Sequence, residues 1–377
     1  MNGALAEVLG AILLLDALVG SLCLVILIVR RVFCRWPDAK LHLNEGETRI
    51  VDGGQSLLAA VRGEGFLLPG SCGGRGTCGI CRVKVRRGGG ESAPAEVVLV
   101  SPSDRRSGVR LACQVRVRGE IEADLPEDAL TAKFVRAFVT ANEKISDDIN
   151  RLQVKVEEPI GWKFTAGQYV QIFREKPHPG DEPLTRAYSL ASDSATPDSI
   201  ELHIRRVPGG EMSPWLCDRK TGDPLWFSGP YGTMTLPEIG SDTDIICVAG
   251  GVGFAPMKSI VLAIAGRRAP PKTWLFVGAA TAEVLYDHDW ATGMAGRYPW
   301  LVYVPCVQNA PGSVAEEKSG HALRFEPGLV TEALERRFPN GKKAVALLCG
   351  PERMVAASRL ILAAKGLPPA GILADVF

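Results

Sequence analysis

A chain of 377 residues is long enough for two or three domains, and its 43 Lys or Arg against 42 Asp or Glu leave a formal net charge of +1. Nucleic-acid-binding proteins need concentrated positive charge, so this balance excludes nucleic acid as an expected partner. With 46% hydrophobic residues the chain can bury several cores, which excludes a disordered scaffold.

The first predicted element is an apolar helix over residues 8–29. Its 22 residues suffice to cross a hydrocarbon core about 30 Å thick. A cleaved signal peptide is the alternative, but the run is long for one, no basic segment precedes it, and Arg30 and Arg31 follow it directly. The basic residues after the span predict an outside N-terminus and a cytoplasmic remainder. We therefore expect residues 1–35 to be a single-pass membrane anchor.

Asp16 places a carboxylate inside this apolar run. A charged side chain in hydrocarbon costs a few kcal/mol unless it is paired. Two interpretations stay open: Asp16 contacts a partner helix or an ion path, or it lies high enough in a tilted helix to reach the outer interface.

Four of the ten cysteines lie in the next segment. Five residues separate Cys72 from Cys78, two separate Cys78 from Cys81, and 31 separate Cys81 from Cys113. Thiolates are soft ligands for zinc or for iron–sulfur clusters, and such clustering indicates a reducing compartment rather than disulfides. Structural zinc usually takes two short cysteine pairs, and the second pair is missing here. The glycines around the first three cysteines let backbone N–H groups approach the sulfurs, so the pattern predicts an iron–sulfur cluster.

Residues 36–129 resemble a 2Fe-2S ferredoxin domain, which has an α+β (β-grasp) fold. LHL, TRIV, CRVKV and CQVRV predict strands, and QSLLAAVRGEG predicts a helix. The resemblance implies that the four cysteines are the cluster ligands. Plant-type domains usually have four residues between the first two ligands, whereas this chain has five.

Residues 130–239 contain short strand patterns separated by turn signals, which predict a small antiparallel barrel: RLQVKVEE, QYVQIF, RAYSLAS, SIELHIRRV and PLWFSGPYG. Arg186, Tyr188 and Ser189 resemble the R-x-Y-S-x-x-S flavin motif of the ferredoxin-NADP reductase superfamily. An arginine can pair with a pyrophosphate, a tyrosine ring can stack, and a hydroxyl can reach a ring nitrogen. The resemblance implies that this domain binds FAD.

A glycine turn follows and opens a predicted helix in GGEMSPWL. Helix N-termini bind anions, so Gly210, Met212 and Ser213 are predicted to hold the diphosphate of FAD. Alone, R-x-Y-S could be a buried strand. Together with this segment and with residues 229–232, GPYG, it becomes specific.

Residues 240–377 alternate between strand and helix patterns, which predicts a parallel, doubly wound α/β sheet. The first strand runs into Gly250, Gly251 and Gly253, which are predicted to hold nucleotide phosphates. This segment resembles the G-G-x-G-x-A-P signature of the same reductase superfamily.

Cys349, Gly350 and Pro351 resemble the C-G-P motif of that superfamily, whose cysteine lies beside the nicotinamide. The alternative for Cys349 is a buried residue at the end of a strand. Phe377 resembles the terminal aromatic residue that shields the flavin until nicotinamide displaces it, although it could also end an edge strand. The catalytic residues implied are Cys349, Ser189 and Phe377.

The choice of pyridine nucleotide follows from charge. An NADP site needs a basic residue for the 2′-phosphate. The strand ends expected to meet the adenosine ribose carry Glu283 and Asp287 and no basic residue nearby. NADH is therefore the predicted electron donor.

The whole chain resembles the family of NADH-oxidising flavoprotein subunits (the F subunits) of the sodium-translocating NADH:quinone oxidoreductases. That family implies electron transfer from NADH through FAD and a 2Fe-2S cluster to integral membrane subunits, quinone reached through those partners, sodium transport by the assembly, and a bacterial inner membrane with the catalytic domains cytoplasmic. A membrane-anchored reductase component that supplies an oxygenase is the alternative, and a nucleotide-binding sensor is a non-enzymatic one. No histidine lies in HExxH or in a recognisable triad, so hydrolysis is not expected.

Overall fold

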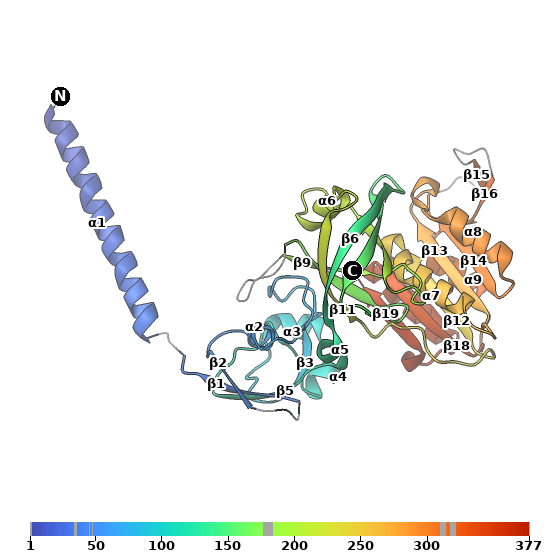
Figure 1. The fold of residues 1–377 in the computed structure, drawn as a ribbon, viewed down its shortest axis with the longest axis horizontal. Coiled ribbons are helices and arrows are strands. Elements are labelled where there is room, and N and C mark those ends of the chain that lie inside the picture. The colour runs from blue at the N-terminus through green and yellow to red at the C-terminus, as the bar shows by residue number, and fades with distance from the viewer. Residues whose placement is uncertain are drawn as a thin grey trace. The chain divides into compact units, whose positions relative to one another are not determined.

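The structure, a computed structural model, describes residues 2–33, 36–44, 46, 48–175, 184–309, 314–316 and 322–376 (Figure 1). The chain divides into two compact units. The first comprises Met1–Leu68 and Gly74–Pro126, and the second comprises Pro69–Gly73 and Glu127–Phe377. The short segment Pro69–Gly73 thus packs with the second unit, although in sequence it interrupts the first.

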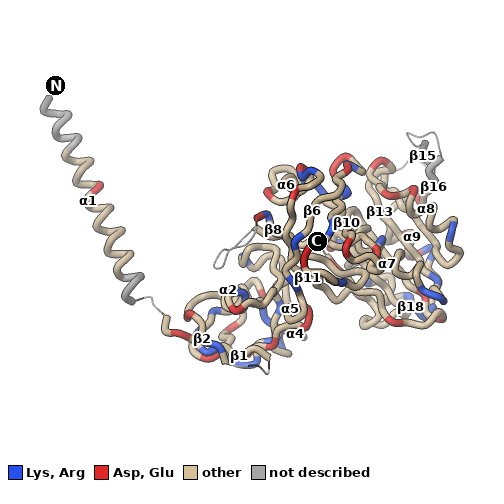
Figure 2. Tube along the Cα trace, in the orientation of Figure 1, with Lys and Arg blue, Asp and Glu red and all other residues tan. Residues whose placement is uncertain are grey.

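Helix α1 (Asn2–Phe33) is the one helix among the described residues that is long and apolar enough to cross a bilayer. Its window Gly10–Ile28 has a mean hydropathy of 2.8, and none of it is buried in the protein. The window contains one acidic residue, Asp16, and Figure 2 shows an acidic position in the described part of this helix. A helix that is apolar on every face is suited to lipid rather than to water.

The first unit contains a five-stranded sheet in the order β2-β1-β5-β3-β4, in which β1 and β5 are parallel and the other pairs are antiparallel. The Ser56 hydroxyl caps the helix that begins at Leu57, because it accepts a hydrogen bond from Ala59 N at 3.1 Å. The elements are β1 (Ala39–Leu43), β2 (Thr48–Val51), α2 (Leu57–Gly63), β3 (Arg82–Arg87), α3 (Pro94–Leu99), α4 (Pro102–Arg106), β4 (Val109–Leu111) and β5 (Glu120–Asp124).

One of the strand predictions for this unit is wrong. CRVKV forms part of β3, but CQVRV does not form a strand, because β4 ends at Leu111 and the chain turns there. Gln114 N donates to Leu111 O at 2.8 Å, which closes the turn. The segment instead forms backbone hydrogen bonds with the residues before helix α2, such as Leu57 N to Val115 O at 2.8 Å, and an isolated bridge between Ser56 and Arg116. The alternation of apolar residues in CQVRV therefore reflects burial of a loop rather than a sheet.

The second unit begins with a six-stranded antiparallel sheet in the order β10-β7-β6-β11-β8-β9. Its long strand β6 was not predicted, whereas the five predicted strands are present. Leucine, valine and isoleucine side chains from all of these strands but β9 form its core. The elements are α5 (Glu127–Thr131), β6 (Lys133–Lys144), β7 (Ile149–Glu158), β8 (Tyr169–Phe173), β9 (Thr185–Ser189), β10 (Ser199–Arg205), α6 (Met212–Cys217) and β11 (Pro224–Tyr231).

A six-stranded parallel sheet follows, in the order β17-β14-β13-β12-β18-β19. Along β12, Ile245 and Cys247 face a core that contains α7, while Ile246 and Val248 face a core that contains α9 and α10. Burial on both faces explains why this strand is apolar throughout. The elements are β12 (Asp244–Gly250), η1 (Gly251–Gly253), α7 (Phe254–Ala265), β13 (Thr273–Ala279), η2 (Ala282–Val284), α8 (His288–Arg297), β14 (Leu301–Val307), β15 (Val314–Glu316), β16 (Ala322–Arg324), β17 (Glu326–Pro327), α9 (Val330–Arg337), β18 (Ala344–Gly350), α10 (Glu352–Ala364), η3 (Pro369–Gly371) and β19 (Ile372–Val376).

Candidate functional site

The loop that carries the first three clustered cysteines depends on left-handed glycines. Such φ values strain any residue with a Cβ atom, so the glycines allow the tight path of the loop. Cys72 lies in the segment Pro69–Gly73 of the second unit, whereas Cys78, Cys81 and Cys113 belong to the first. Cys78 is half-buried and the other three are buried. The left-handed residues, with their φ values, are Gly73 (61°), Gly74 (78°), Gly76 (73°) and Gly79 (68°).

A hydrogen bond between the thiols of Cys81 and Cys113 lowers the pKa of the Cys113 thiol and raises that of the Cys81 thiol. The side-chain amide of Gln114 donates to Cys113 Sγ and to Gly74 O, at 3.4 Å in each case. Metal ligation requires the thiolate, and hydrogen bonds to sulfur stabilise it. The donor set therefore fits an iron–sulfur cluster.

A buried ion pair supports the chain that leads to Cys113. The Glu96 carboxylate accepts from Arg110 Nε and Nη2, both at 2.9 Å, and from Leu111 N at 2.8 Å. Burial acts to raise the pKa of Glu96, but these hydrogen bonds together lower it. Leu111 ends β4 two residues before Cys113, so the ion pair holds the backbone that leads directly to this cysteine.

The predicted flavin motif lies on β9 and continues just beyond it. Arg186 Nη1 donates to Ser71 O at 2.8 Å and to Thr185 O at 2.7 Å, so its guanidinium holds backbone next to Cys72. Sequence reasoning assigned this arginine to a pyrophosphate and missed the backbone contact. Tyr188 packs against the core of the sheet, and burial raises the pKa of its hydroxyl.

The motif contains two serines, Ser189 and Ser192. Ser189, the last residue of β9, lies in register with Tyr169 of β8. Ser192, the last residue of the motif, is 8% exposed, and its buried Oγ has no hydrogen-bond partner within the described part of the chain. An unpaired buried hydroxyl is costly, so this position fits contact with an additional polar group.

The segment predicted to hold the diphosphate is closed by its own hydrogen bonds. Ser213 Oγ accepts from Val207 N at 3.0 Å, and Gly210 N donates to Val207 O at 3.0 Å. Met212 is buried and begins α6. The turn is therefore rigid, with backbone groups at the start of a short helix.

Two glycine motifs meet where β12 and β18 end. The strands are parallel neighbours, with Ala249 opposite Cys349. A Cβ atom on Gly253 would lie 2.2 Å from Cys349 O, and one on Gly350 would lie 3.1 Å from Gly250 N. Only glycine permits this approach between the two strand ends, which lie at the carboxyl edge of a parallel sheet. Nucleotides bind at that edge in open α/β sheets.

The other residues predicted for nucleotide binding lie around this edge. Gly251 has a φ of 56°, and a Cβ on it would lie 2.5 Å from Arg205 Nη2. Cys349 is fully buried, and burial raises the pKa of its thiol well above the ordinary value, so it is uncharged. Pro351 is the N-cap of α10. Phe377 lies outside the described residues.

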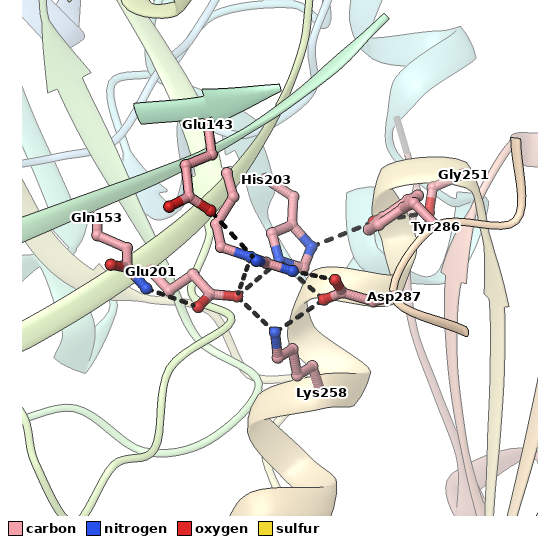
Figure 3. Close-up of polar contacts among 9 residues, drawn as sticks. Glu143, Gln153, Glu201, His203, Gly251, Lys258, Tyr286 and Asp287 are labelled. Atoms are coloured by element: carbon pink, nitrogen blue, oxygen red, sulfur yellow. Dashed lines mark hydrogen bonds and ion pairs between the residues drawn. The ribbon is translucent and has the colours of Figure 1, made fainter. Parts of the chain in front are cut away.

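A buried charge cluster beside this edge was missed (Figure 3). Lys258 Nζ donates to Glu201 Oε1 at 2.7 Å and to Asp287 Oδ2 at 2.8 Å. Asp287, expected near the adenosine ribose without a basic neighbour, also pairs with Arg151 and has a side chain only 3% exposed. That expectation is wrong for Asp287. One signal could have revealed the cluster, namely the lone charge of Lys258 in the otherwise apolar helix α7.

Three family models match consecutive parts of the chain. The 2Fe-2S iron-sulfur cluster binding domain matches residues 41–118, the oxidoreductase FAD-binding domain matches residues 136–236, and the oxidoreductase NAD-binding domain matches residues 247–359. These matches support FAD, NADH and a 2Fe-2S cluster as the cofactors.

Curated relatives match the chain from end to end. The F subunit of the Na(+)-translocating NADH-quinone reductase of Neisseria meningitidis is 28% identical, over 98% of this chain and 99% of the relative. The protein of the same name from Pasteurella multocida is 27% identical, with the same shares covered.

Solved structures of reductases are similar to most of the chain. The Amycolatopsis cytochrome P450 reductase GcoB is 29% identical, with a TM-score of 0.69, over 90% of this chain and 98% of its own. A ferredoxin reductase of carbazole 1,9a-dioxygenase is similar in fold, with a TM-score of 0.65 at 24% identity over the same shares. The chain therefore belongs to the oxidoreductases that join a 2Fe-2S domain to FAD-binding and NAD-binding domains, the group that includes the F subunits of the Na(+)-translocating NADH-quinone reductases.

Proposed function

We propose that this chain is the NADH-oxidising subunit of a sodium-translocating NADH:quinone oxidoreductase. It passes electrons from NADH by way of FAD and a 2Fe-2S cluster to integral membrane subunits, which reduce quinone and move sodium. The observation that carries this proposal is the agreement over 98% of the chain and 99% of the named relative, since that span includes the apolar helix as well as the three cofactor domains.

The proposed domains are an anchor at 1–35, a β-grasp ferredoxin domain at 36–129, a flavin barrel at 130–239 and a doubly wound nucleotide domain at 240–377. The bridge between Leu190 and Leu202 supports closure of the barrel, because it joins the chain after β9 to β10 at the opposite edge of the sheet. The cores on both faces of the parallel sheet support the doubly wound arrangement.

Bound FAD would supply the chemistry that converts a hydride into single electrons, and the 2Fe-2S cluster would supply one-electron transfer. The four cysteines Cys72, Cys78, Cys81 and Cys113 would hold the iron. On the flavin side, Tyr188 offers its ring face, Ser189 its hydroxyl to a ring nitrogen, and Ser192 an unpaired hydroxyl.

The protein groups at the nucleotide edge position the donor and keep water away. The turn from Gly250 to Gly253 offers backbone N–H groups at the start of α7, where anions bind favourably. Gly350 allows the ends of β12 and β18 to approach closely, and the buried, uncharged thiol of Cys349 keeps charge and water away from this edge. We assign Phe377 to the flavin face that nicotinamide must reach.

We place α1 as a single span in a bacterial inner membrane, with the N-terminus outside and the cofactor domains in the cytoplasm. Arg30 and Arg31, directly after the apolar window, support this orientation. Asp16 would then contact a helix of a partner subunit, because a carboxylate in lipid is stable only when it is paired.

The test is isolation of the full-length chain from its native membranes in mild detergent, followed by mass spectrometry of co-purifying chains. We expect very hydrophobic integral subunits and NADH-dependent quinone reduction that sodium stimulates. Recovery with an oxygenase, or alone, with NADH oxidation intact would contradict the pump assignment. The same electron path would then supply an oxygenase, as the name of the Amycolatopsis cytochrome P450 reductase suggests for that protein.

A further inference from the structure

The buried charge cluster joins the two halves of the second unit beside the nucleotide edge (Figure 3). Glu201 and His203 lie on β10 of the antiparallel sheet, and Lys258 lies on α7 of the parallel-sheet half. Asp287 precedes α8 and has a left-handed φ of 55°, a conformation that a residue with a Cβ atom adopts only when its surroundings hold it there. Each carboxylate contacts the Lys258 ammonium, so this side chain ties the halves together.

Three members of the cluster, Glu201, His203 and Asp287, have ligand atoms close enough together to hold a metal ion. The ammonium of Lys258 already lies 2.7 Å from Glu201 Oε1 and 2.8 Å from Asp287 Oδ2. It occupies the position of a cation and neutralises the carboxylates together with Arg151. The cluster is therefore a set of charge pairs rather than an ion site.

A hydrogen-bonded chain runs from this cluster to the glycine turn. His203 Nε2 lies 2.8 Å from Glu201 Oε1, and its Nδ1 lies 3.2 Å from the Tyr286 hydroxyl. The same hydroxyl lies 3.2 Å from Gly251 O. The Gly251 carbonyl also accepts from Phe254 N, which begins α7. The chain thus connects a carboxylate on β10 with the first peptide of the turn after β12.

The hydrogen-bonded chain contains one more acceptor than it has hydrogens to donate. A carboxylate accepts, so His203 Nε2 must carry its hydrogen toward Glu201. Burial lowers the pKa of His203, so the ring is neutral and its Nδ1 is an acceptor. The Tyr286 hydroxyl then has one hydrogen and two acceptors, His203 Nδ1 and Gly251 O.

The direction of the Gly251 carbonyl determines the direction of the next backbone N–H. In a planar trans peptide, the C=O of Gly251 and the N–H of Val252 point in opposite directions. A hydroxyl hydrogen donated to Gly251 O therefore aims the Val252 N–H away from Tyr286. Backbone N–H groups at the start of a helix such as α7 are the groups that bind nucleotide phosphates.

We propose that Tyr286 is a positioning residue for nucleotide binding: its hydroxyl orients the Gly251–Val252 peptide, and His203 competes for the hydroxyl hydrogen. This inference rests on the proposed binding of NADH by this domain. The ligand class is a dinucleotide diphosphate, and the affected quantity is its affinity rather than the rate of hydride transfer.

The experiment compares three variants of the full-length protein in detergent. Tyr286→Phe removes the hydroxyl and keeps the ring. His203→Leu removes the competing acceptor, and Glu201 keeps its hydrogen bond from Lys258. Tyr303→Phe is the matched control. The Tyr303 hydroxyl lies 3.2 Å from His288 Nδ1, which is the same distance as that between the Tyr286 hydroxyl and His203 Nδ1.

Binding of ADP-ribose is measured by calorimetry, and NADH oxidation is followed with ferricyanide, which takes electrons from the flavin without membrane partners. For Tyr286→Phe we expect the Kd of ADP-ribose and the KM of NADH to rise about 3- to 10-fold, the range of one hydrogen bond. The kcat at saturating NADH should stay within about twofold, since the hydroxyl affects binding. For His203→Leu we expect equal or tighter ADP-ribose binding, and for Tyr303→Phe no change.

Unchanged ADP-ribose affinity in Tyr286→Phe, or equal weakening in all three variants, would overturn the proposal. If Tyr286→Phe does not fold, as judged by its FAD content and Tm, His203→Leu decides, and weaker binding there overturns the proposal. The proposed function fails separately, when the wild-type protein neither binds ADP-ribose nor oxidises NADH.

Discussion

The side chain of Gln171 and the backbone of Gly70 form a reciprocal pair of hydrogen bonds across 101 residues of sequence. Gly70 N donates to Gln171 Oε1 at 3.2 Å, and Gln171 Nε2 donates to Gly70 O at 2.9 Å. Gln171 is 2% exposed, so these bonds form away from water. Thr185 Oγ1 also donates to Gly70 O, at 3.1 Å. The backbone just before Cys72 is thus built into the sheet that carries the flavin motif.

Gln171→Leu tests whether this pair of hydrogen bonds affects the rate of electron transfer from flavin to cluster. The substitution leaves a buried N–H and C=O of Gly70 with fewer partners, at a cost of about 1–3 kcal/mol for each unpaired group. We expect slower reduction of the cluster by NADH, with flavin reduction unchanged, because only the segment before Cys72 is loosened. Stopped-flow absorbance of the flavin and freeze-quench EPR of the cluster separate the two steps. Gln168→Leu is the control, since its amide bonds only locally, to Thr165 N; an equal delay there would contradict the expectation.

Cys78→Ala should remove the iron–sulfur cluster and leave FAD bound. The three remaining thiols cannot complete a four-thiolate ligand set. We expect iron to be lost while NADH still reduces ferricyanide through the flavin, as measured by iron analysis and absorbance. Cys217→Ala provides the comparison, because this half-buried cysteine lies in α6 outside the loop. Loss of flavin together with iron in Cys78→Ala would show that the two cofactor sites depend on each other.

Gly253→Ala should impair nucleotide binding through a backbone collision. The new Cβ would lie 2.2 Å from Cys349 O and 2.5 Å from Cys349 C, neither of which can rotate away. Because displacements near 1 Å can lower rates about a hundredfold, we expect kcat/KM for NADH to fall roughly 10- to 100-fold. Gly266→Ala, at the other end of the same helix, has its nearest neighbour at 3.6 Å and should be tolerated. Wild-type kinetics in Gly253→Ala would contradict the close approach of the two motifs.

Glu201→Gln tests the stabilisation contributed by the charge cluster. Burial acts to raise the pKa of Glu201, but the hydrogen bond from His203 and the charge of Lys258 lower it from 4.5 to about 2. A lowered pKa in the folded state means stabilisation that is complete above about pH 4.5 and is lost as the pH falls toward 2. The shift corresponds to about 3 kcal/mol.

We therefore expect the urea-unfolding free energy of the wild type to fall more than that of Glu201→Gln between about pH 5 and about pH 3.5. Glu143→Gln is the matched control, because the Glu143 side chain is 65% exposed and its oxygen is 3.7 Å from Arg151. Parallel pH profiles for wild type and Glu201→Gln would show that the cluster does not stabilise the charged carboxylate.

The sequence predicted an element well or poorly depending on how that element is buried. DIICVAG was predicted correctly as β12 because a strand covered on both faces is apolar at every position. CQVRV was predicted wrongly because Val115 and Val117 are buried as alternating residues of a loop. In that case the alternation of apolar residues reflects burial but not membership of a strand. Strand β6 was missed although its inward residues, such as Val135, Ala137 and Val139, alternate in the same way.

The site was predictable where a motif is local and unpredictable where contacts are distant. The glycine motifs that include Gly250 and Gly350 consist of consecutive residues, so they could be recognised in the sequence and placed at strand ends. The contacts of Lys258 with Glu201 and of Gln171 with Gly70 join residues 57 and 101 positions apart. Neither periodicity nor motif spacing contains such pairings, which arise only when sheets assemble.

The register that sets Ala249 beside Cys349 also has a consequence for biosynthesis. Strand β12 gains its neighbour β18 only after residues 344–350 have left the ribosome, when most of the chain already exists. The cysteines of the cluster are made far earlier. A nascent or prematurely terminated chain that ends before β18 therefore lacks half of the strand edge at which we propose that the nucleotide binds, although it already contains all four clustered cysteines.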